Sequence, residues 1–391
     1  MKRDRRWIRL AQAGIAGIAL GTLVIGSLPP RAYNKDLQVE YLTAWALRDG
    51  VDIFTPVNEL SARYFPAPSQ SFPHPSPHPP VLALISLPMT LVPFPVLALL
   101  WLALNVALLI LIGRWLGLSV QASLPLAAWP PVWWVLYLGQ YELILLVMAL
   151  LGWRAAARGQ DWRAGMWLGV ATAIKFYPAV FLLSFVVRRR WRLILSAGLV
   201  VGLSQLGSLA AVGVNPFLHY YTDILPTVSA GYAHIGLNSS PYGALLRLFG
   251  GSTDVIPLIS APGIVVPATV VISLLALAAL LKLEPEAAPA VALVALPQVW
   301  FYQAVMALPE LVALVRTVNL RRAALVAGLA MSLVVPLLNN LLSPILQAMQ
   351  WSGTKAPPFA GVLAAIPPLG GVLLLILALA RAQQGTTEPK K

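Results

Sequence analysis

Two carboxylates stand close together in a chain that has few other charged side chains. Only 10% of the 391 residues are charged and 59% are hydrophobic, yet Asp36 and Glu40 lie one helical turn apart in YNKDLQVEYLTAW, residues 33–45. A carboxylate on a half-buried helix can have its basicity tuned by burial and can act as a general base. Asp36 could equally be a cap or dipole partner at the start of that helix. The sequence leaves both interpretations open.

A lysine inside an apolar stretch is the second candidate. Lys175 lies within AGMWLGVATAIKFYPAVFLLSFVV, residues 164–187. An ionisable residue at membrane depth indicates a functional site, and a lysine is a compact cation suited to a phosphate. The alternative is a lysine that snorkels to the membrane surface, which its central position disfavours.

Other patterns that carry chemistry are absent from the sequence. There is no glycine-rich phosphate loop, no HExxH and no GxSxG, and the four histidines lack metal-ligand spacing. The chain has no cysteine, which excludes disulfides and thiolate chemistry. These absences argue against a soluble nucleotide-binding enzyme.

The elements that must position these residues are membrane helices. The mean hydropathy of +0.78 predicts an all-α polytopic membrane protein, because a helix satisfies its own backbone hydrogen bonds in lipid. We expect about 11–12 transmembrane passes, together with juxtamembrane helices on the outer face. The apolar segments cover residues 8–28, 96–113, 119–137, 143–153, 164–187, 193–213, 255–281, 287–299, 302–316, 323–345 and 359–381.

The basic residues predict the orientation of these passes. If the N-terminus is cytoplasmic, 20 of the 27 lysines and arginines fall on the inner side, as the positive-inside rule expects, and the C-terminus is cytoplasmic too. Residues 164–187 do not fit, because arginines flank both ends of a segment too short to cross about 30 Å of hydrocarbon twice as full helices. The segment is either a short hairpin broken at Tyr177-Pro178 or one tilted span.

We therefore expect one integral-membrane domain over residues 1–391. Its parts are a first transmembrane helix (1–28), a first outer loop with juxtamembrane helices (29–95), core helices that include the broken hairpin (96–213), a second outer loop (214–254), C-terminal helices (255–381) and a cytoplasmic tail (382–391).

Five stretches, in this order, resemble glycosyltransferase family 87. They are DLQVEYLTAWALRDGVDIFTP (36–56), HPPVLALISLPMTLVPFPVLALLWLALN (78–105), GQYELILLVMALLGWRAAARGQDWRAGMWLGVATAIKFYPAVFLLSFVVRRRWR (139–192), NSSPYGALLRL (238–248) and LPQVWFYQAVMALPELVAL (296–314). The resemblance covers residues 30–320 approximately. It implies a bacterial membrane enzyme of the GT-C architecture.

The resemblance also implies a reaction. Such an enzyme takes a sugar, mannose or arabinofuranose, from a polyprenyl-phosphate donor and places it on a lipid or glycan acceptor, with inversion, at the outer face of the cytoplasmic membrane. Asp36 matches the family's proposed catalytic base. No cofactor is required, although a divalent cation held by Asp36 and Glu40 is possible, and no nucleic acid is involved.

The resemblance and the charges together suggest further site residues. We expect three to bind the donor phosphate, namely Lys175, Arg63 and His78. We expect eight to bind the acceptor or the sugar, namely Glu40, Tyr41, Gln140, Glu142, Asn238, Ser239, Trp300 and Tyr302.

Two positions depart from the family pattern. Glu142 stands where the family commonly has asparagine, and the late motif reads Trp300-Phe301-Tyr302-Gln303, with Tyr302 where the family has histidine. His78 could supply the missing imidazole.

Two other classes of protein remain as alternatives. A transporter or flippase of lipid-linked sugars would show intramembrane charge pairs and matching halves, and the sequence shows only Lys175 and no repeat. A binding or scaffold protein would tolerate Asp36→Asn, because asparagine caps a helix as readily as aspartate.

Overall fold

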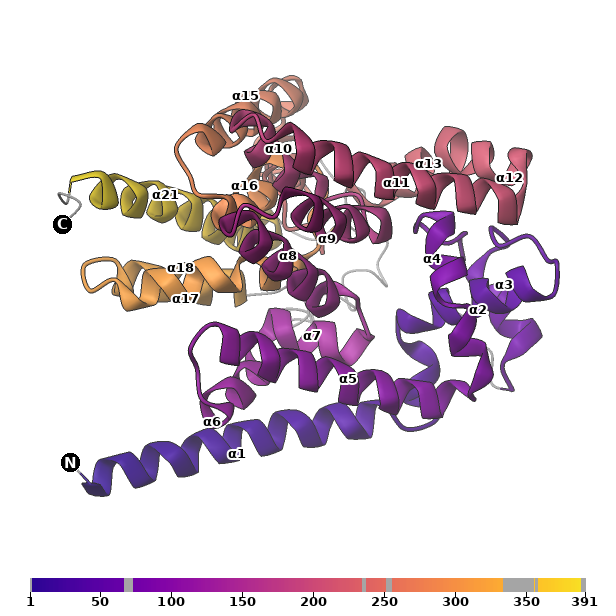
Figure 1. Ribbon diagram of the computed structural model, residues 1–391, viewed down its shortest axis with the longest axis horizontal. Helices are drawn as coiled ribbons and strands as arrows, with labels where there is room; N and C mark the ends of the chain where they lie inside the picture. The colour runs from indigo at the N-terminus through magenta and orange to yellow at the C-terminus, as the bar shows by residue number, and fades with distance from the viewer. Residues whose placement is uncertain are drawn as a thin grey trace. The chain divides into compact units, whose positions relative to one another are not determined.

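The described part of the chain is mostly helical. The computed structural model describes residues 2–66, 73–233, 237–250, 255–332, 355 and 358–387 (Figure 1). That part of the chain contains no strand, and an isolated bridge pairs Asn238 with Trp300. Since helices satisfy backbone hydrogen bonds within apolar runs, this confirms the predicted all-α class.

The chain divides into two compact units. The first consists of Met1–Phe176 with Leu195–Val228, and the second of Tyr177–Ile194 with Ser229–Lys391. The expected single membrane domain over residues 1–391 stays a prediction.

The first unit holds most of the N-terminal helices. They are α1 (Lys2–Gly26), η1 (Arg31–Asn34), α2 (Leu37–Arg48), α3 (Val57–Tyr64), α4 (Pro80–Ile85), η2 (Leu87–Leu91), α5 (Phe94–Trp115), α6 (Val120–Ser123), η3 (Leu124–Ala128), α7 (Pro130–Leu138), α8 (Glu142–Ala157), α9 (Asp161–Ile174), α12 (Val214–His219) and η4 (Tyr220–Ile224). Two helices contribute to both units, α11 (Trp191–Val212) and α13 (Leu225–Ala233).

The second unit contains the later helices. They are α10 (Ala179–Val187), α14 (Pro241–Leu245), η5 (Leu246–Gly250), η6 (Pro262–Ile264), α15 (Val265–Ala278), η7 (Ala279–Leu281), η8 (Pro285–Ala287), α16 (Ala288–Ala295), η9 (Phe301–Ala307), α17 (Leu308–Arg316), α18 (Arg321–Ser332), α20 (Pro358–Leu363) and α21 (Ile366–Thr387).

Several helices could cross a membrane. Four stretches of the described chain are long and apolar enough, namely Phe94–Trp115, Trp191–Val212, Pro262–Leu281 and Pro358–Gln384, and the pair α7 and α8 forms a fifth if it is one broken span. The expected 11–12 passes stay a prediction, because α9, α16 and α17 have only 14, 8 and 9 residues. Of the segment expected at 323–345, residues 333–345 lie outside the described residues.

The segment expected as one span at 119–137 has a different structure. It consists of α6, η3 and α7 in succession. Prolines explain the division, since Pro125 stands in the first turn of η3 and Pro130 begins α7. Proline is tolerated in a first turn, where its missing N–H costs nothing, but it interrupts the interior of a helix.

The break expected at Tyr177-Pro178 is confirmed. Helix α9 ends at Ile174, Lys175 adopts an extended conformation (φ −139°, ψ 142°), and α10 begins directly after Pro178. Because α9 belongs to the first unit and α10 to the second, the choice between a hairpin and one tilted span stays a prediction.

The packing of the first unit brings three segments to one place. Helix α2, whose Leu37, Leu42 and Ala44 are fully buried, packs against α3, α4 and η2. Helices α8 and α9 pack as an antiparallel pair joined by residues 158–160. Their close approach depends on Gly152, because a Cβ there would lie 2.8 Å from Leu168 Cγ. The start of α8 therefore lies beside the end of α9.

Candidate active site

Asp36 stands at the N-cap of α2 but does not cap the helix with its side chain. An N-cap aspartate ordinarily accepts a hydrogen bond from a backbone N–H of the first turn, and Asp36 makes no such bond. Its Oδ2 instead accepts a hydrogen bond of 2.5 Å from Nε2 of Gln140. Side-chain capping therefore does not account for this aspartate.

A sharp bend in the chain brings Gln140 to Asp36. Helix α7 ends at Gly139, which has the left-handed conformation (φ 75°), and the N–H groups of Gly139 and Gln140 both donate to the carbonyl of Val135. The axes of α7 and α8 differ by 114° at this point. A Cβ on Gly139 would lie 2.8 Å from Cβ of Leu37. Glycine thus allows both the turn and its contact with the start of α2.

A buried ion pair lies next to this bend. Glu142, the first residue of α8, and Lys175, directly after α9, meet because the two helices are antiparallel neighbours. Nζ of Lys175 lies 2.7 Å from Oε1 of Glu142, and the side chains are 8% and 0% exposed. An acid at the start of one helix and a base at the end of another also suit both helix dipoles.

Gln140 connects the ion pair to Asp36. Nζ of Lys175 donates to Oε1 of Gln140 at 2.8 Å, while Nε2 of the same amide donates to Asp36. The four side chains of Glu142, Lys175, Gln140 and Asp36 form one hydrogen-bonded series, which we call the carboxylate relay.

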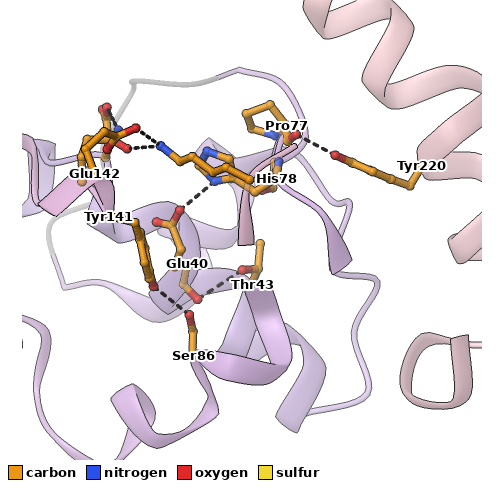
Figure 2. Close-up of polar contacts among 12 residues, drawn as sticks. Glu40, Thr43, Pro77, His78, Ser86, Tyr141, Glu142 and Tyr220 are labelled. Atoms are coloured by element: carbon orange, nitrogen blue, oxygen red, sulfur yellow. Dashed lines mark hydrogen bonds and ion pairs between the residues drawn. The ribbon is translucent and has the colours of Figure 1, made fainter. Parts of the chain in front are cut away.

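A second carboxylate on α2 pairs with a histidine. Oε1 of Glu40 lies 2.7 Å from Nδ1 of His78, and Figure 2 shows the two side chains pointing toward each other. Glu40 is 4% exposed and the His78 side chain 19%. Both residues line a small pocket with Thr43, Ser76 and Phe54. The backbone beside His78 is held as well, because Tyr220 donates to the carbonyl of Pro77 at 2.9 Å.

The environment of Asp36 makes its carboxylate more basic. Burial is the main cause and raises the pKa of Asp36 from 3.8 to about 6. The hydrogen bond from Gln140 and the charges of Lys175 and His78 lower this pKa, and the charge of Glu40 raises it. The residue keeps intermediate solvent exposure. A carboxylate that titrates this close to neutral pH is suited to accept a proton from a hydroxyl.

Lys35 is a charged neighbour that the sequence did not single out. It is 2% exposed, and its ammonium donates to the carbonyl of Tyr137. Burial lowers the pKa of Lys35 to about 8, although the negative charge of Asp36 acts to raise it. The signal available in the sequence was its position next to Asp36. Tyr141, whose hydroxyl lies 3.2 Å from Ser86 Oγ, was signalled by its place between Gln140 and Glu142.

Two residues expected in the site have other contacts in the first unit. The hydroxyl of Tyr41 donates to the carbonyl of Val92 at 3.1 Å, and its ring lies 5.0 Å from that of Phe94. Arg63 is exposed on α3, with its guanidinium 5.5 Å from the ring of Tyr64. Tyr41 thus packs in the aromatic core, and Arg63 contacts Tyr64 and solvent.

The other four expected residues belong to the second unit. The amide of Asn238 donates to the carbonyl of Pro297 at 3.1 Å and accepts from the N–H of Val299 at 3.1 Å. Trp300 stacks on Tyr302 with ring centroids 6.0 Å apart. Ser239 lines a mostly apolar pocket with Trp300. Here Asn238 serves to join two loops.

A divalent cation stays a prediction. In the described ranges, no three His, Asp or Glu side chains gather closely enough to hold a metal ion.

The comparisons with known proteins agree with the resemblance. A model described as glycosyltransferase family 87 matches residues 77–309, a range that includes Gln140, Glu142 and Lys175 but begins after Asp36. No solved structure matches the chain.

The similar curated proteins are mycobacterial transferases. A polyprenol-phosphate-mannose-dependent alpha-(1-2)-phosphatidylinositol pentamannoside mannosyltransferase of Mycobacterium tuberculosis is 30% identical over 54% of this chain and 50% of the relative. A protein of the same description from Mycolicibacterium smegmatis is 28% identical over 48% of each chain. This chain matches about half the length of these relatives.

Proposed function

Because the chain belongs to glycosyltransferase family 87, we propose that it transfers mannose from a polyprenyl-phosphate donor to a lipid acceptor. The descriptions of the mycobacterial relatives support this donor and an acceptor of the phosphatidylinositol mannoside class. Arabinofuranose is the second sugar to test. The reaction takes place at the outer face of the cytoplasmic membrane, with both chain termini in the cytoplasm.

The observation that carries the proposal is the orientation of Asp36. At the N-cap of α2 its carboxylate makes no capping bond, but joins the side chains of two other segments through Gln140. Burial also raises its pKa to about 6. A half-buried carboxylate with a raised pKa and charged neighbours is typical of a catalytic base.

Asp36 takes the proton of the acceptor hydroxyl as the acceptor oxygen attacks the anomeric carbon of the sugar. The bond between that carbon and the phosphate oxygen breaks, and its electron pair leaves with polyprenyl phosphate. Direct displacement inverts the anomeric configuration. The reaction needs no cofactor, because the donor already carries a good leaving group. Protonated Asp36 then returns its proton to solvent.

The leaving phosphate gains a negative charge that the site must stabilise. Of the three basic residues expected to bind it, His78 has the geometry that fits best, because its ring is 19% exposed at a pocket. Lys175 is held by Glu142 and Gln140, and Arg63 points to solvent. From this pocket the His78 ring can contact the phosphate while its Nδ1 lies 2.7 Å from Oε1 of Glu40.

The test is transfer of radiolabelled sugar by purified protein. Wild type is incubated with polyprenyl-phosphate mannose, or separately polyprenyl-phosphate arabinose, and a phosphatidylinositol mannoside acceptor. We expect labelled lipid from the mannose donor. Asp36→Asn should lower the rate by about 10²–10⁴-fold, as the loss of a general base does.

A matched control lies at the other end of the same helix. Asp49 follows α2 and accepts a hydrogen bond of 3.1 Å from the hydroxyl of Tyr64, a bond that asparagine can also accept. Asp49→Asn should transfer sugar at the wild-type rate. Full activity of Asp36→Asn would contradict the assignment of the base. No transfer by wild type from either donor would contradict the proposed reaction and favour a transporter.

A further inference from the structure

The carboxylate relay has a fixed direction. A lysine ammonium has three donors and no acceptor, so the atom of Gln140 that faces Lys175 must be its oxygen. The NH₂ group of the same amide must then face Asp36. Hydrogen-bond chemistry thus fixes the orientation of the amide.

The ion pair explains why Lys175 stays in this position. Its charge is compensated by Glu142, which is 0% exposed. A buried charge is tolerated when it is paired and hydrogen-bonded, and here the pair also makes the hydrogen bond to Gln140. The two residues therefore form a support behind the amide of Gln140, which is itself only 3% exposed.

The support acts on one oxygen of Asp36. Oδ2 receives the hydrogen bond of Gln140, while the residue keeps intermediate solvent exposure. The start of α2 fixes the backbone of Asp36, so the remaining freedom is rotation of its side chain. The bond to Gln140 restricts that rotation.

We infer that Gln140, oriented by the Glu142–Lys175 ion pair, is a positioning residue that holds the carboxylate of Asp36 in the orientation needed to accept the proton of the acceptor hydroxyl. The inference rests on the proposed function, in which Asp36 is the base. It gives Gln140, Glu142 and Lys175 a role through Asp36, in place of the direct contacts with acceptor or donor phosphate that the sequence suggested.

The charges around Asp36 define the expected pH dependence. Burial and Glu40 favour the protonated carboxyl, whereas Gln140 and the cations favour the ionised one. Loss of the Gln140 amide should therefore raise the pH at which activity appears. Added net positive charge in the carboxylate relay should lower the pH at which activity appears. The charged and titratable groups that act on Asp36 are Lys35 before α2, Glu40 within α2, His78 before α4 and Lys175 after α9. Glu142 at the start of α8 is paired with Lys175 and acts through it.

The experiment compares the pH profiles of kcat/KM for mannose transfer by wild type, Gln140→Leu and Gln140→Glu in lipid nanodiscs. Both substitutions should move the acidic limb upward, by about one pH unit for leucine and more for the isosteric glutamate. Above the acidic limb of each variant, where Asp36 is ionised, kcat should fall about 10- to 100-fold because the base is misplaced. KM for the acceptor should change less than about threefold.

Glu142→Gln should shift the acidic limb of the pH profile in the opposite direction. Glutamine still accepts the hydrogen bond of Lys175, but the relay gains one positive charge, so the acidic limb should move to lower pH. Gln205→Leu is the matched control, because Gln205 makes a bond of 2.5 Å to Tyr221 in the same unit. It should leave the limb and kcat unchanged.

Opposite shifts in the Gln140 and Glu142 variants would support the inference. If Gln140→Glu kept the wild-type limb and kcat, while Asp36→Asn remained inactive, the positioning role would be wrong and the base would stand. If a direct contact with the acceptor were the role of Gln140, KM would rise with kcat retained, which also overturns the inference. An Asp36→Asn protein with full activity would instead contradict the proposed function itself.

Discussion

The two units use their buried polar side chains differently. In the first unit, Asp36, Gln140, Glu142 and Lys175 bond to one another across large separations in the sequence. In the second unit, Asn238 bonds to backbone groups of Pro297 and Val299. Side-chain bonds to backbone groups hold loops in place, whereas a cluster of buried ionisable groups costs stability and is typical of a functional site.

Each unit nevertheless contains an ion pair with a buried carboxylate. Lys175 pairs with Glu142 in the first, and Arg381 of α21 pairs with Glu310 of α17 in the second, at 2.6 Å, with Glu310 1% exposed. The N–O distances of the two pairs are similar but, among the described residues, their surroundings differ, because Lys175 also donates to an amide that bonds to a third charged group. An ion pair with a buried carboxylate therefore does not by itself mark a functional site.

Removal of the two cations should separate these roles. Lys175→Met leaves Glu142 buried without its cation, and the loss of stability should be about 3–5 kcal/mol, measured as a lower Tm in nanodiscs. It should also lower kcat, because Gln140 loses its support. Arg381→Met should lower the Tm by less, since Arg381 is 36% exposed, and should leave kcat unchanged at a temperature where both proteins are folded.

A second change tests the reason for the Tm loss. Glu142→Gln combined with Lys175→Met removes both charges, so most of the lost stability should return while kcat stays low. A double variant that recovers full activity would show that the charges matter only for folding, and the distinction between the two ion pairs would disappear.

Two glycines test the bend that joins α2 to the relay. Gly139→Ala introduces a left-handed alanine and a Cβ 2.8 Å from Leu37 Cβ, so it should cost about 1–3 kcal/mol and lower kcat by moving Gln140. Gly50→Ala meets a similar φ of 67° but no atom within 4 Å. It should cost about 1 kcal/mol and keep the wild-type kcat. Equal kcat for both variants would mean that the bend does not place Gln140.

The smallest effect is expected in the second unit. Ser240 caps α14 by accepting from the N–H of Gly243 at 3.0 Å and donates to the carbonyl of Pro297 at 2.7 Å. Ser240→Ala should cost about 1 kcal/mol in chemical unfolding and leave kcat as it is. If kcat fell more than the folded fraction, the loops of the second unit would belong to the reaction, and the contrast between the units would weaken.

Local features of this fold could be predicted from the sequence. The helix after Asp36, the first helix within residues 1–28 and the break beside Pro178 follow from helical spacing, hydropathy and proline chemistry. The number of passes could not be confirmed in this way, because prolines such as Pro125 and Pro130 divide apolar runs into helices shorter than a bilayer.

The site was predictable as a set of residue types but not as a geometry. Asp36, Gln140, Glu142 and Lys175 were each expected from charge or motif, but their mutual bonds depend on the left-handed turn at Gly139 and on the antiparallel packing of α8 and α9. Those are long-range contacts, since Gln140 lies 104 residues from Asp36. No local pattern encodes them.

The most direct test of the account is the pH profile of kcat/KM for wild-type mannose transfer. Because the base must be ionised, activity should fall as the pH drops through about 6, the raised pKa of Asp36, and should be constant above it as far as this group is concerned. A limb near pH 6 supports Asp36 as the base in its buried environment. A profile that stays flat down to pH 4.5 would contradict it.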